Sequence, residues 1–361
     1  MTENRKTPKL RFKGFTDAWE QRKLGEVLRT IPFKPFLKIP EQGGKYEIIQ
    51  QGNEPIIGYA NGEPCEDFRN TVIFGDHTLS LYKPKQPFFV ATDGVRILQG
   101  TNDMYGYYLL SLLEGNSPQS EGYKRYYSIL ADREVLFTEN HYEQVKIGLY
   151  FKNLDNLITL HQHKLDRLKN IKKSMLDKMF PKDGEVVPEI RFKGFTDAWE
   201  QRKLGDVVEI CSGRDYKHLS EGKIPVYGTG GYMLSVSEAL SYDKDAIGIG
   251  RKGTIDNPYI LKAPFWTVDT LFFAIPLENK DLNFIFDLFQ NVDWKKKDES
   301  TGVPSLTRTV INDIDFLEPR YKEQQVIGEF FSRFDNLITL HQRKLDKLKN
   351  IKKSMLDNMF V

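Results

Sequence analysis

Residues Gly248–Gly253 read GIGRKG and satisfy G-x-G-x-x-G, the pattern of a glycine turn that can hold the pyrophosphate of a dinucleotide. That chemistry needs the turn to open a helix whose N-terminus faces the phosphates. Here TIDNPYILKAPFWTV follows, with Pro258 and Pro264 among β-forming residues, so no helix is expected. A glycine-rich turn that carries Arg251 and Lys252 is better suited to approach a nucleic-acid backbone or a base edge.

Other catalytic patterns are incomplete. DNPY at Asp256–Tyr259 is similar to the N-P-P-Y loop of amino-methyltransferases, but it lacks the second proline and an upstream glycine loop for AdoMet. ENK at Glu278–Lys280 is a nuclease-like E-x-K without a convincing partner aspartate. The H-E-x-x-H, P-loop and G-x-S-x-G motifs do not occur, and Cys65 and Cys211 have no metal-ligand spacing. We therefore expect no catalytic residue and no metal site in this chain.

The remaining candidates are basic, hydroxyl and aromatic side chains near expected loops. Arg and Lys can read guanine through O6 and N7, and they also bind phosphates. The candidates in the second half are Arg214, Lys217, Tyr227, Thr229, Arg251, Lys252, Ser305 and Arg308. Those in the first half are Lys83, Lys85, Arg96, Lys124 and Arg125. Each one alone is more simply a solvated surface group, but as a set they favour DNA.

These candidates fall in two middle segments, about residues 28–130 and 208–310, that resemble each other only in scattered positions. Both segments alternate short β-forming runs, such as TVIFGDHTLSLY and PFFVATDGVRIL, with Gly, Pro and Asn. This pattern predicts β-rich, mixed α+β globular domains whose sheets carry long loops.

The segments that flank the middles are duplicated at an offset of 180 residues. Arg11–Gly25 and Arg191–Gly205 are identical, and Phe151–Phe180 nearly repeats as Phe331–Phe360. Neutral substitution after a gene duplication would make the end segments and the middle segments diverge to a similar extent. Near-identity beside strong divergence indicates that the ends do one shared job and the middles do two different ones.

The second duplicated segment carries apolar side chains in alternating steps of four and three, which is a heptad seam. The seam residues are Leu154, Ile158, His161, Leu165, Leu168 and Met175, and then Phe334, Ile338, His341, Leu345, Leu348 and Met355. Two helices are therefore expected from near His141 and Tyr321, each of roughly 38 residues and about 57 Å. Lys172 and Lys352 are polar seam positions that could set the register.

Such a seam needs a partner, and the other copy in the same chain is the favoured one. Packing of each helix on its own domain, or pairing between chains, is the alternative.

The 361 residues suffice for two or three domains, and 40% hydrophobic with 28% charged residues is typical of soluble proteins. The polar N-terminus argues against a secretory signal, and no apolar run approaches the ~18–20 residues of a membrane span. We expect a cytoplasmic protein with no membrane contact. The net charge of +2 does not by itself indicate nucleic acid, although basic groups can still gather on one face.

The chain resembles, over essentially its whole length, the specificity subunit (HsdS) of type I restriction-modification systems. The resemblance rests on the two FTDAWEQRKLG openings, on Pro319 before Glu323-Gln324, and on the LDNLITLHQ and FDNLITLHQ helices. In the second half it extends to IPVYGTGG, GIGRKGTI and TGVPSLTRTVI. The first half departs: LSLYKPK (Leu79–Lys85) is the approximate counterpart of GIGRKG, and EGYKRYYSIL replaces TGVPSLTRTV. Pro319 has no counterpart either, since Asn140 precedes the first HYEQ.

The resemblance implies target-recognition domains at residues 1–140 and 183–320, and spacer helices at 141–182 and 321–361 that pair as an antiparallel intramolecular coiled coil with pseudo-twofold symmetry. It implies a non-catalytic subunit that binds double-stranded DNA, docks two methyltransferase subunits and, through that complex, meets the restriction subunits. AdoMet would then belong to the methyltransferase partner, and ATP and Mg to the restriction partner, with no cofactor in this chain.

The physical pattern fits independently. Two different DNA-recognition domains held at a fixed distance would recognise two different half-sites. These half-sites would lie about 34–36 Å apart if both domains meet the same face of the duplex. Shared ends would offer equivalent surfaces to two identical partners. A self-contained DNA methyltransferase or nuclease, or a coiled-coil scaffold that binds only proteins, are the alternatives.

Overall fold

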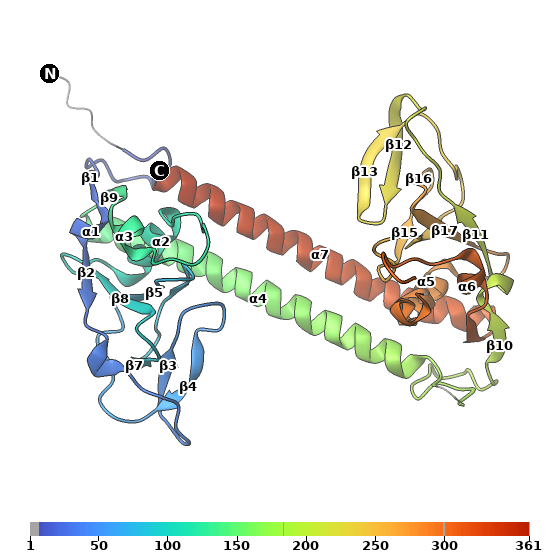
Figure 1. Ribbon diagram of the computed structural model, residues 1–361, viewed down its shortest axis with the longest axis horizontal. Coiled ribbons are helices and arrows are strands. Elements are labelled where there is room, and N and C mark those ends of the chain that lie inside the picture. The colour runs from blue at the N-terminus through green and yellow to red at the C-terminus, as the bar shows by residue number, and fades with distance from the viewer. Residues whose placement is uncertain (1–6, 183, 299, 361) are drawn as a thin grey trace. The chain divides into compact units, whose positions relative to one another are not determined.

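The computed structural model describes residues 7–182, 184–298 and 300–360. The chain forms two compact units, Met1–His163 with Gln342–Val361, and Lys164–His341. Each unit contains one globular domain together with parts of both long helices, α4 and α7 in Figure 1. The boundary between the units crosses both helices near their middles, because each helix end packs into the domain beside it. The sequence-based prediction instead treated each helix as a separate segment.

The domain of the first unit contains nine strands and several short helices within the described residues. They are β1 (Glu20–Lys23), α1 (Leu24–Val27), β2 (Leu28–Ile31), η1 (Lys34–Phe36), β3 (Tyr46–Ile49), β4 (Ile56–Ala60), β5 (Thr71–Gly75), β6 (Leu81–Tyr82), β7 (Phe88–Val90), β8 (Val95–Gly100), α2 (Gly106–Gly115), α3 (Tyr127–Ala131) and β9 (Glu134–Phe137). The sheets have the orders β2-β8-β5-β6, β4-β3-β7 and β1-β9. Strand β5 is buried at every position, which suits its run of mostly apolar, β-forming residues, TVIFG.

The domain of the second unit repeats this plan. Its elements are β10 (Glu200–Lys203), η2 (Leu204–Asp206), β11 (Val208–Ser212), β12 (Glu221–Gly228), β13 (Gly231–Val236), β14 (Ala246–Gly250), β15 (Tyr259–Leu261), β16 (Trp266–Thr267), β17 (Leu271–Pro276), α5 (Leu282–Asn291), η3 (Trp294–Lys297), α6 (Arg308–Asn312) and β18 (Asp315–Glu318). The sheet orders β11-β17-β14-β15, β13-β12-β16 and β10-β18 match those of the first domain strand for strand. The predicted mixed, β-rich domains are confirmed.

The matching orders correct one sequence alignment. Strand β14, which contains the start of GIGRKG, corresponds to β5, and β15 corresponds to β6. LSLYKPK contains β6, so its assignment as the counterpart of GIGRKG was wrong. The true counterpart is the end of β5 and the residues after it, Phe74–His77, which carry one glycine and no basic residue except His77.

The two long helices are α4 (His141–Met179) and α7 (Tyr321–Met359), each 39 residues long. Both begin at the predicted residues. The side chain of Asn140 accepts a hydrogen bond from the Glu143 backbone N–H at 3.1 Å, which caps the start of α4. Pro181 follows the end of α4, where it cannot continue the helix.

In the first unit the beginning of α4 and the end of α7 share one apolar cluster. Ile147, Phe151 and Leu154 of α4 belong to the same buried set as Leu356 and Met359 of α7. The Lys352 ammonium, on α7, donates to Asp155 of α4 at 2.6 Å and to Glu114 of α2 at 2.8 Å. The pairing of a beginning with an end shows that the helices are antiparallel here.

The second unit has the reciprocal arrangement. Leu176 and Met179 near the end of α4 share a buried cluster with Ile327 and Phe331 near the beginning of α7. Lys172 of α4 donates to Asp335 of α7 at 2.5 Å and to Gln290 of α5 at 2.6 Å. Its side chain also lies 4.0 Å from the buried carboxylate of Asp287. Both lysines that the sequence placed in the seam are therefore held by charged or polar partners.

The predicted seam residues are all at least half-buried. Leu154, Leu165 and Leu345 are buried, and Ile158, His161, Leu168, Met175, Phe334, Ile338, His341, Leu348 and Met355 are half-buried. The outer faces remain exposed at Leu157 and Leu160 of α4 and at Leu337 and Leu340 of α7.

The Glu-Gln pair at the start of each helix connects it to its domain. Glu143 is fully buried and accepts hydrogen bonds from Arg11 at 2.6 and 2.8 Å and from the Trp19 indole at 3.1 Å. Gln144 accepts from the backbone N–H of Tyr105 and donates to the Thr138 carbonyl. In the second unit Glu323 accepts from Arg191, and Gln324 makes the matching contacts with Asp281 and Pro319. The arginine, glutamate and glutamine contacts are thus duplicated, whereas the buried Trp199 indole has no hydrogen-bond partner among the described residues where Trp19 donates to Glu143.

Each long helix also crosses its domain helix very closely. A Cβ on Gly148 of α4 would lie 2.7 Å from the Tyr108 backbone nitrogen, and one on Gly328 of α7 would lie 2.8 Å from that of Phe284. Only glycine allows this approach, which fixes α4 against α2 and α7 against α5. Within the described residues, no helix is long and apolar enough to cross a membrane.

Candidate nucleic-acid interface

Three loops of the second domain meet at the end of β14. The Arg251 backbone N–H donates to Thr270 at 2.8 Å, the Leu306 N–H donates to Arg251 at 2.9 Å, and the Gly253 N–H donates to Pro304 at 2.8 Å. We call residues 250–254, 268–270 and 303–306 corner 2. The predicted absence of a helix after GIGRKG is confirmed, because β15 is the next element after β14. The glycine motif therefore shapes a turn and not a dinucleotide site.

Gly250 is required by the close approach of the chain to itself. A Cβ at this position would lie 1.9 Å from the Thr254 carbonyl oxygen, far inside van der Waals contact. Gly253 has φ +92°, in the left-handed region that favours glycine. These two residues turn the chain so that Arg251 and Lys252 stand between them at the surface.

The Arg251 side chain is exposed, and two contacts hold its guanidinium in place. The guanidinium carbon lies 5.6 Å from the centre of the Phe272 ring, and Nη1 lies 3.4 Å from the Asp269 carbonyl oxygen. This stacking orients the guanidinium while leaving most of its N–H groups available. Lys252, next to it, is also exposed.

The loop that contains Ser305 is braced by Asp298. Its carboxylate accepts from the backbone N–H groups of Ser305 and Ser300, each at 3.0 Å. Hydrogen bonds from Ser305 and then Ser300 lower the pKa of Asp298, so this brace stays ionised at neutral pH. Ser305 is half-buried, and its neighbour Pro304 is exposed.

The hairpin of β12 and β13 (yellow in Figure 1) carries the YGTGG turn. The Tyr259 hydroxyl, on β15, donates to the Gly228 carbonyl at 2.6 Å, and burial raises the pKa of Tyr259, which keeps this donor protonated. Tyr227 packs against Tyr259 with ring centres 6.1 Å apart. Tyr227 and Thr229 are half-buried at this turn.

Three further basic candidates of the second half are exposed. Arg214 has its backbone fixed, because its N–H donates to Thr267 and its carbonyl accepts from the Trp266 indole, each at 2.9 Å. Arg308, at the start of α6, donates to the Ser212 hydroxyl at 3.1 Å. Lys217 follows Arg214 in the same loop.

The first domain builds the same junction from different residues. The Asp76 N–H donates to Gly94 and the Tyr126 N–H donates to Asp76, both at 2.8 Å, which repeats the backbone pattern of Arg251. We call residues 75–77, 93–96 and 123–127 corner 1. Asp76 thus occupies the place of Arg251. The segment EGYKRYYSIL occupies the same place in the fold of the first domain as TGVPSLTRTV does in the second.

The basic candidates of corner 1 are paired with carboxylates. Arg96 donates to Asp76 at 3.1 and 3.2 Å, and Arg125 lies 3.8 Å from Asp76 and 3.4 Å from Asp93. Lys124 pairs with Glu121 at 2.6 Å. Arg125 is the most exposed of the three basic side chains, at 54%.

Lys83 lies inside the domain, although the sequence placed it among surface contacts. Its side chain is buried, and its ammonium donates to the Phe68 carbonyl at 2.6 Å and to the Pro84 carbonyl at 3.3 Å. Burial lowers the pKa of Lys83 to about 8. This position argues against a DNA contact, whereas Lys85, two residues later, is exposed.

Sequence reasoning missed Asp76, His77, Asp93 and Tyr123 as parts of this junction. The misplaced alignment hid them, because it matched GIGRKG to the edge strand β6. A run of buried β-formers that ends in glycine, TVIFG, was the signal that could have found Asp76. The 180-residue offset already aligned Gly122 with Gly302, which places Tyr123 at the Val303 position.

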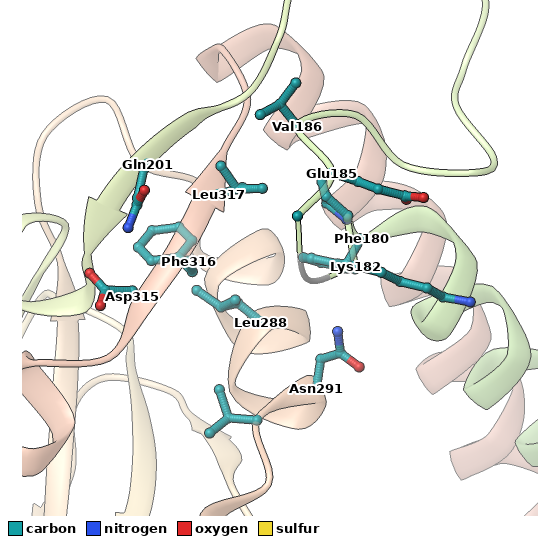
Figure 2. Close-up of a pocket in the computed structure, with 13 residues that line it drawn as sticks. Phe180, Lys182, Glu185, Val186, Gln201, Leu288, Asn291, Asp315, Phe316 and Leu317 are labelled. Carbon is teal, nitrogen blue, oxygen red and sulfur yellow. The ribbon is translucent and has the colours of Figure 1, made fainter.

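A pocket of about 490 Å³ lies elsewhere in the second unit, under the segment that follows α4. Figure 2 shows Leu288 and Asn291 of α5 and Phe316 and Leu317 of β18 around it. Its described lining includes no DNA candidate, so the pocket is separate from corner 2. Among the residues that the structure describes, His, Cys, Asp and Glu side chains form no group of three or more that could hold a metal ion.

Comparisons with known proteins agree with this architecture. Residues 196–350 match the family described as type I restriction modification DNA specificity domain. The specificity subunit of type I restriction enzyme MjaVIII from Methanocaldococcus jannaschii is 24% identical over 255 residues, which are 60% of this chain and 58% of that protein's length. The crystal structure of the S subunit of a type I restriction-modification system from M. genitalium has a TM-score of 0.74 at 18% identity, covering 98% of this chain and 99% of the other.

The S-subunit likeness shows the fold, and the family match and the archaeal relative add the sequence evidence. Residues 196–350 thus match the type I restriction modification DNA specificity domain, and the chain as a whole is similar to specificity subunits of type I restriction-modification systems.

Proposed function

We propose that this chain is the non-catalytic DNA-reading subunit of a type I restriction-modification complex, and that each domain reads one half-site of a bipartite, asymmetric target. The observation that carries this proposal is the contrast between the two corners. Equivalent backbone hydrogen bonds hold Arg251 in one domain and Asp76 in the other. A shared scaffold that carries unlike side chains suits two different base sequences.

The long helices would set the gap between the half-sites. Antiparallel contacts in each unit support a continuous intramolecular coiled coil, in which seam length determines how far apart the readers are held. With both domains on one face of the duplex, the half-site centres would be about one turn apart, roughly 34–36 Å.

The outer helix faces would dock two methyltransferase subunits. Leu157 and Leu160 on α4 are 44% and 47% exposed, and Leu337 and Leu340 on α7 are 44% and 46% exposed. Both pairs belong to the sequence DNLITL, which occurs identically at residues 155–160 and 335–340. Two equal apolar faces suit two copies of one partner. AdoMet would be bound by that partner, and ATP and Mg by restriction subunits that join the assembled complex.

The test of reading is the methylation pattern in cells. The chain would be co-expressed with the methyltransferase subunit, and methylated adenines would be sequenced with and without it. We expect one bipartite motif that disappears without the chain. A methylation pattern that does not depend on the chain would refute the proposal. AdoMet or metal binding by the isolated chain in calorimetry would favour a self-contained enzyme, and a complex whose DNA affinity is absent or insensitive to salt would favour a protein scaffold.

The test of docking is stoichiometry. Replacing Leu337 and Leu340 with serine should reduce the complex from two methyltransferase subunits to one, as measured by native mass. The matched control is Asn336→Ala, at an exposed neighbouring position on the same turn. Two bound subunits in the double variant would exclude this face.

A further inference from the structure

The carboxylate of Asp76 is fully buried at the end of β5 and satisfied by groups from two neighbouring segments. Arg96 donates twice to Oδ2, and the Tyr127 N–H donates to Oδ1 at 2.8 Å. The Arg96 guanidinium also lies 5.3 Å from the centre of the Tyr127 ring. A buried charge needs such compensation, and Arg96 supplies most of it. Arg96 is therefore engaged inside the corner.

Arg125 is differently placed. Its contacts with Asp76 and Asp93 are long, 3.8 and 3.4 Å, and 54% of its side chain is exposed. The two carboxylates orient the guanidinium without occupying most of its five N–H groups. Such a side chain can still donate two parallel hydrogen bonds to a flat acceptor pair.

The backbone on both sides of Arg125 is fixed to the strand end. His77 Nδ1 lies 3.1 Å from the Lys124 carbonyl oxygen, and the Tyr126 N–H donates to the Asp76 carbonyl at 2.8 Å. The His77 ring stacks on Tyr123 with centres 4.6 Å apart and an angle of 4° between planes, and Tyr123 is 87% exposed. Consecutive residues Asp76 and His77 thus clamp the loop that carries Arg125.

Corner 2 uses the opposite arrangement. Its arginine, Arg251, comes from the strand end itself and stacks on Phe272, which occupies the place of Arg96. Ser305 occupies the place of Arg125. The positive group that is exposed comes from the strand end in the second domain and from the loop before α3 in the first.

We propose that Arg125 reads a guanine in the half-site of the first domain, and that Asp76 is the positioning residue that aims it. This inference rests on the proposed function and deepens it. Arginine pairs with guanine O6 and N7 through two hydrogen bonds, which requires a guanidinium held at a fixed angle. Asp76 fixes that angle in two ways. Its carboxylate attracts the Arg125 guanidinium, and its backbone carbonyl accepts the hydrogen bond that holds the loop.

The experiment uses the full chain assembled with its methyltransferase subunits. Adenine methylation is sequenced for the unaltered chain and for Arg125→Ala, Arg125→Lys and Asp76→Asn. Binding is measured on the cognate duplex and on duplexes with 7-deazaguanine, which lacks the N7 acceptor, at each guanine of the half-site. We expect Arg125→Ala to reduce discrimination at one guanine about 10- to 100-fold, with the other half-site unchanged.

The lysine variant separates base reading from phosphate binding. Lysine keeps the charge but replaces the planar fork of N–H donors with a single flexible ammonium, so Arg125→Lys should weaken the discrimination. Asp76→Asn, checked for folding by thermal unfolding, should reduce the same ratio at the same guanine although Arg125 is intact. Equal loss of affinity for cognate and altered duplexes, or full discrimination in Arg125→Lys, would overturn the inference.

Two controls separate this inference from the proposed function. Arg69→Ala removes an exposed arginine just before the opposite end of β5 and should leave the motif unchanged. Arg251→Ala should relax only the other half-site. A bipartite motif that responds to Arg251→Ala and not to Arg125→Ala refutes the role of Arg125 alone, whereas no chain-dependent motif refutes the function.

Discussion

Lys352 on α7 donates to the carboxylate of Asp155 on α4 at 2.6 Å, and the same ammonium contacts Glu114 of the first domain. Lys172 and Asp335 repeat this relationship in the second unit at 2.5 Å. Each lysine therefore joins three elements, namely its own helix, the facing helix and a domain helix. Burial lowers the pKa of Lys352, but Glu114 and Asp155 outweigh it and raise the pKa overall, so the ammonium is charged at neutral pH.

Removing either ammonium should destabilise only its own unit. Lys352→Met leaves Glu114 buried beside Asp155 without a counter-charge, which should cost about 1–3 kcal/mol, below the value for a fully buried pair because Asp155 is partly exposed. Chemical unfolding monitored separately for the two units is the measurement. Lys353→Met, at an exposed neighbouring position, is the control, and an equal effect of both variants would contradict the prediction.

Lys83 should give the first unit a distinctive pH dependence. The folded pKa is lowered from 10.5 to about 8, so the unfolded chain binds more protons between these values and stability rises with pH in that window. Relative to Lys83→Met, the unaltered chain should gain at most about 3 kcal/mol from pH 8 to 10.5. Unfolding free energies at several pH values test this, with Lys85→Met as the exposed control. A difference between the unaltered chain and Lys83→Met that stays constant with pH would show that the ammonium is not buried.

Gly250→Ala should distort corner 2. Because the new methyl group would lie 1.9 Å from the Thr254 carbonyl, the turn must shift, at a cost of about 1–3 kcal/mol. Gly230→Ala is a matched control, since a Cβ there would meet no atom within 4 Å. Thermal unfolding of both variants distinguishes a steric requirement from a general loss of flexibility, which would affect the two equally.

Glu143→Gln should loosen the beginning of α4. The glutamine keeps the shape but leaves Arg11, only 12% exposed, without its counter-charge, which should cost about 2–4 kcal/mol. Amide hydrogen exchange in the first two turns of α4 should accelerate. Exposed Glu139→Gln provides the comparison, and unchanged protection in Glu143→Gln would mean that packing alone holds the helix start.

The long helices and the domain class could be predicted because their signals are local and repeated. The heptad seam gave both starting residues, and buried β-forming runs indicated the sheets. Whether a single polar residue is buried or exposed could not be predicted in the same way. Lys83 looks like any surface lysine until the backbone carbonyls of Phe68 and Pro84 surround it. Its burial also depends on the Tyr107 ring of α2, 5.4 Å from the ammonium, and no local sequence pattern predicts such tertiary contacts.

The candidate site was recovered better in the second domain than in the first. Glycines in GIGRKG mark the turn directly, because the close approach at Gly250 excludes every other residue. The turn of the first domain carries only Gly75, and its key group, Asp76, is acidic, whereas most of the predicted DNA contacts are basic. An aspartate that orients arginines from other segments leaves no local pattern.

The lysine that joins three elements has a partner that differs between the units: Glu114 of α2 in the first, Gln290 at the same position of α5 in the second. The helices are common to both halves, so whatever domain is attached to them has to offer an oxygen acceptor at that one place. Compatibility between a new domain and the existing helices would then depend on a single side chain that lies outside the two corners. A grafted domain with leucine there would leave the lysine paired only with the carboxylate of the facing helix and one of its N–H groups without an acceptor, and should assemble poorly whatever its loops carry.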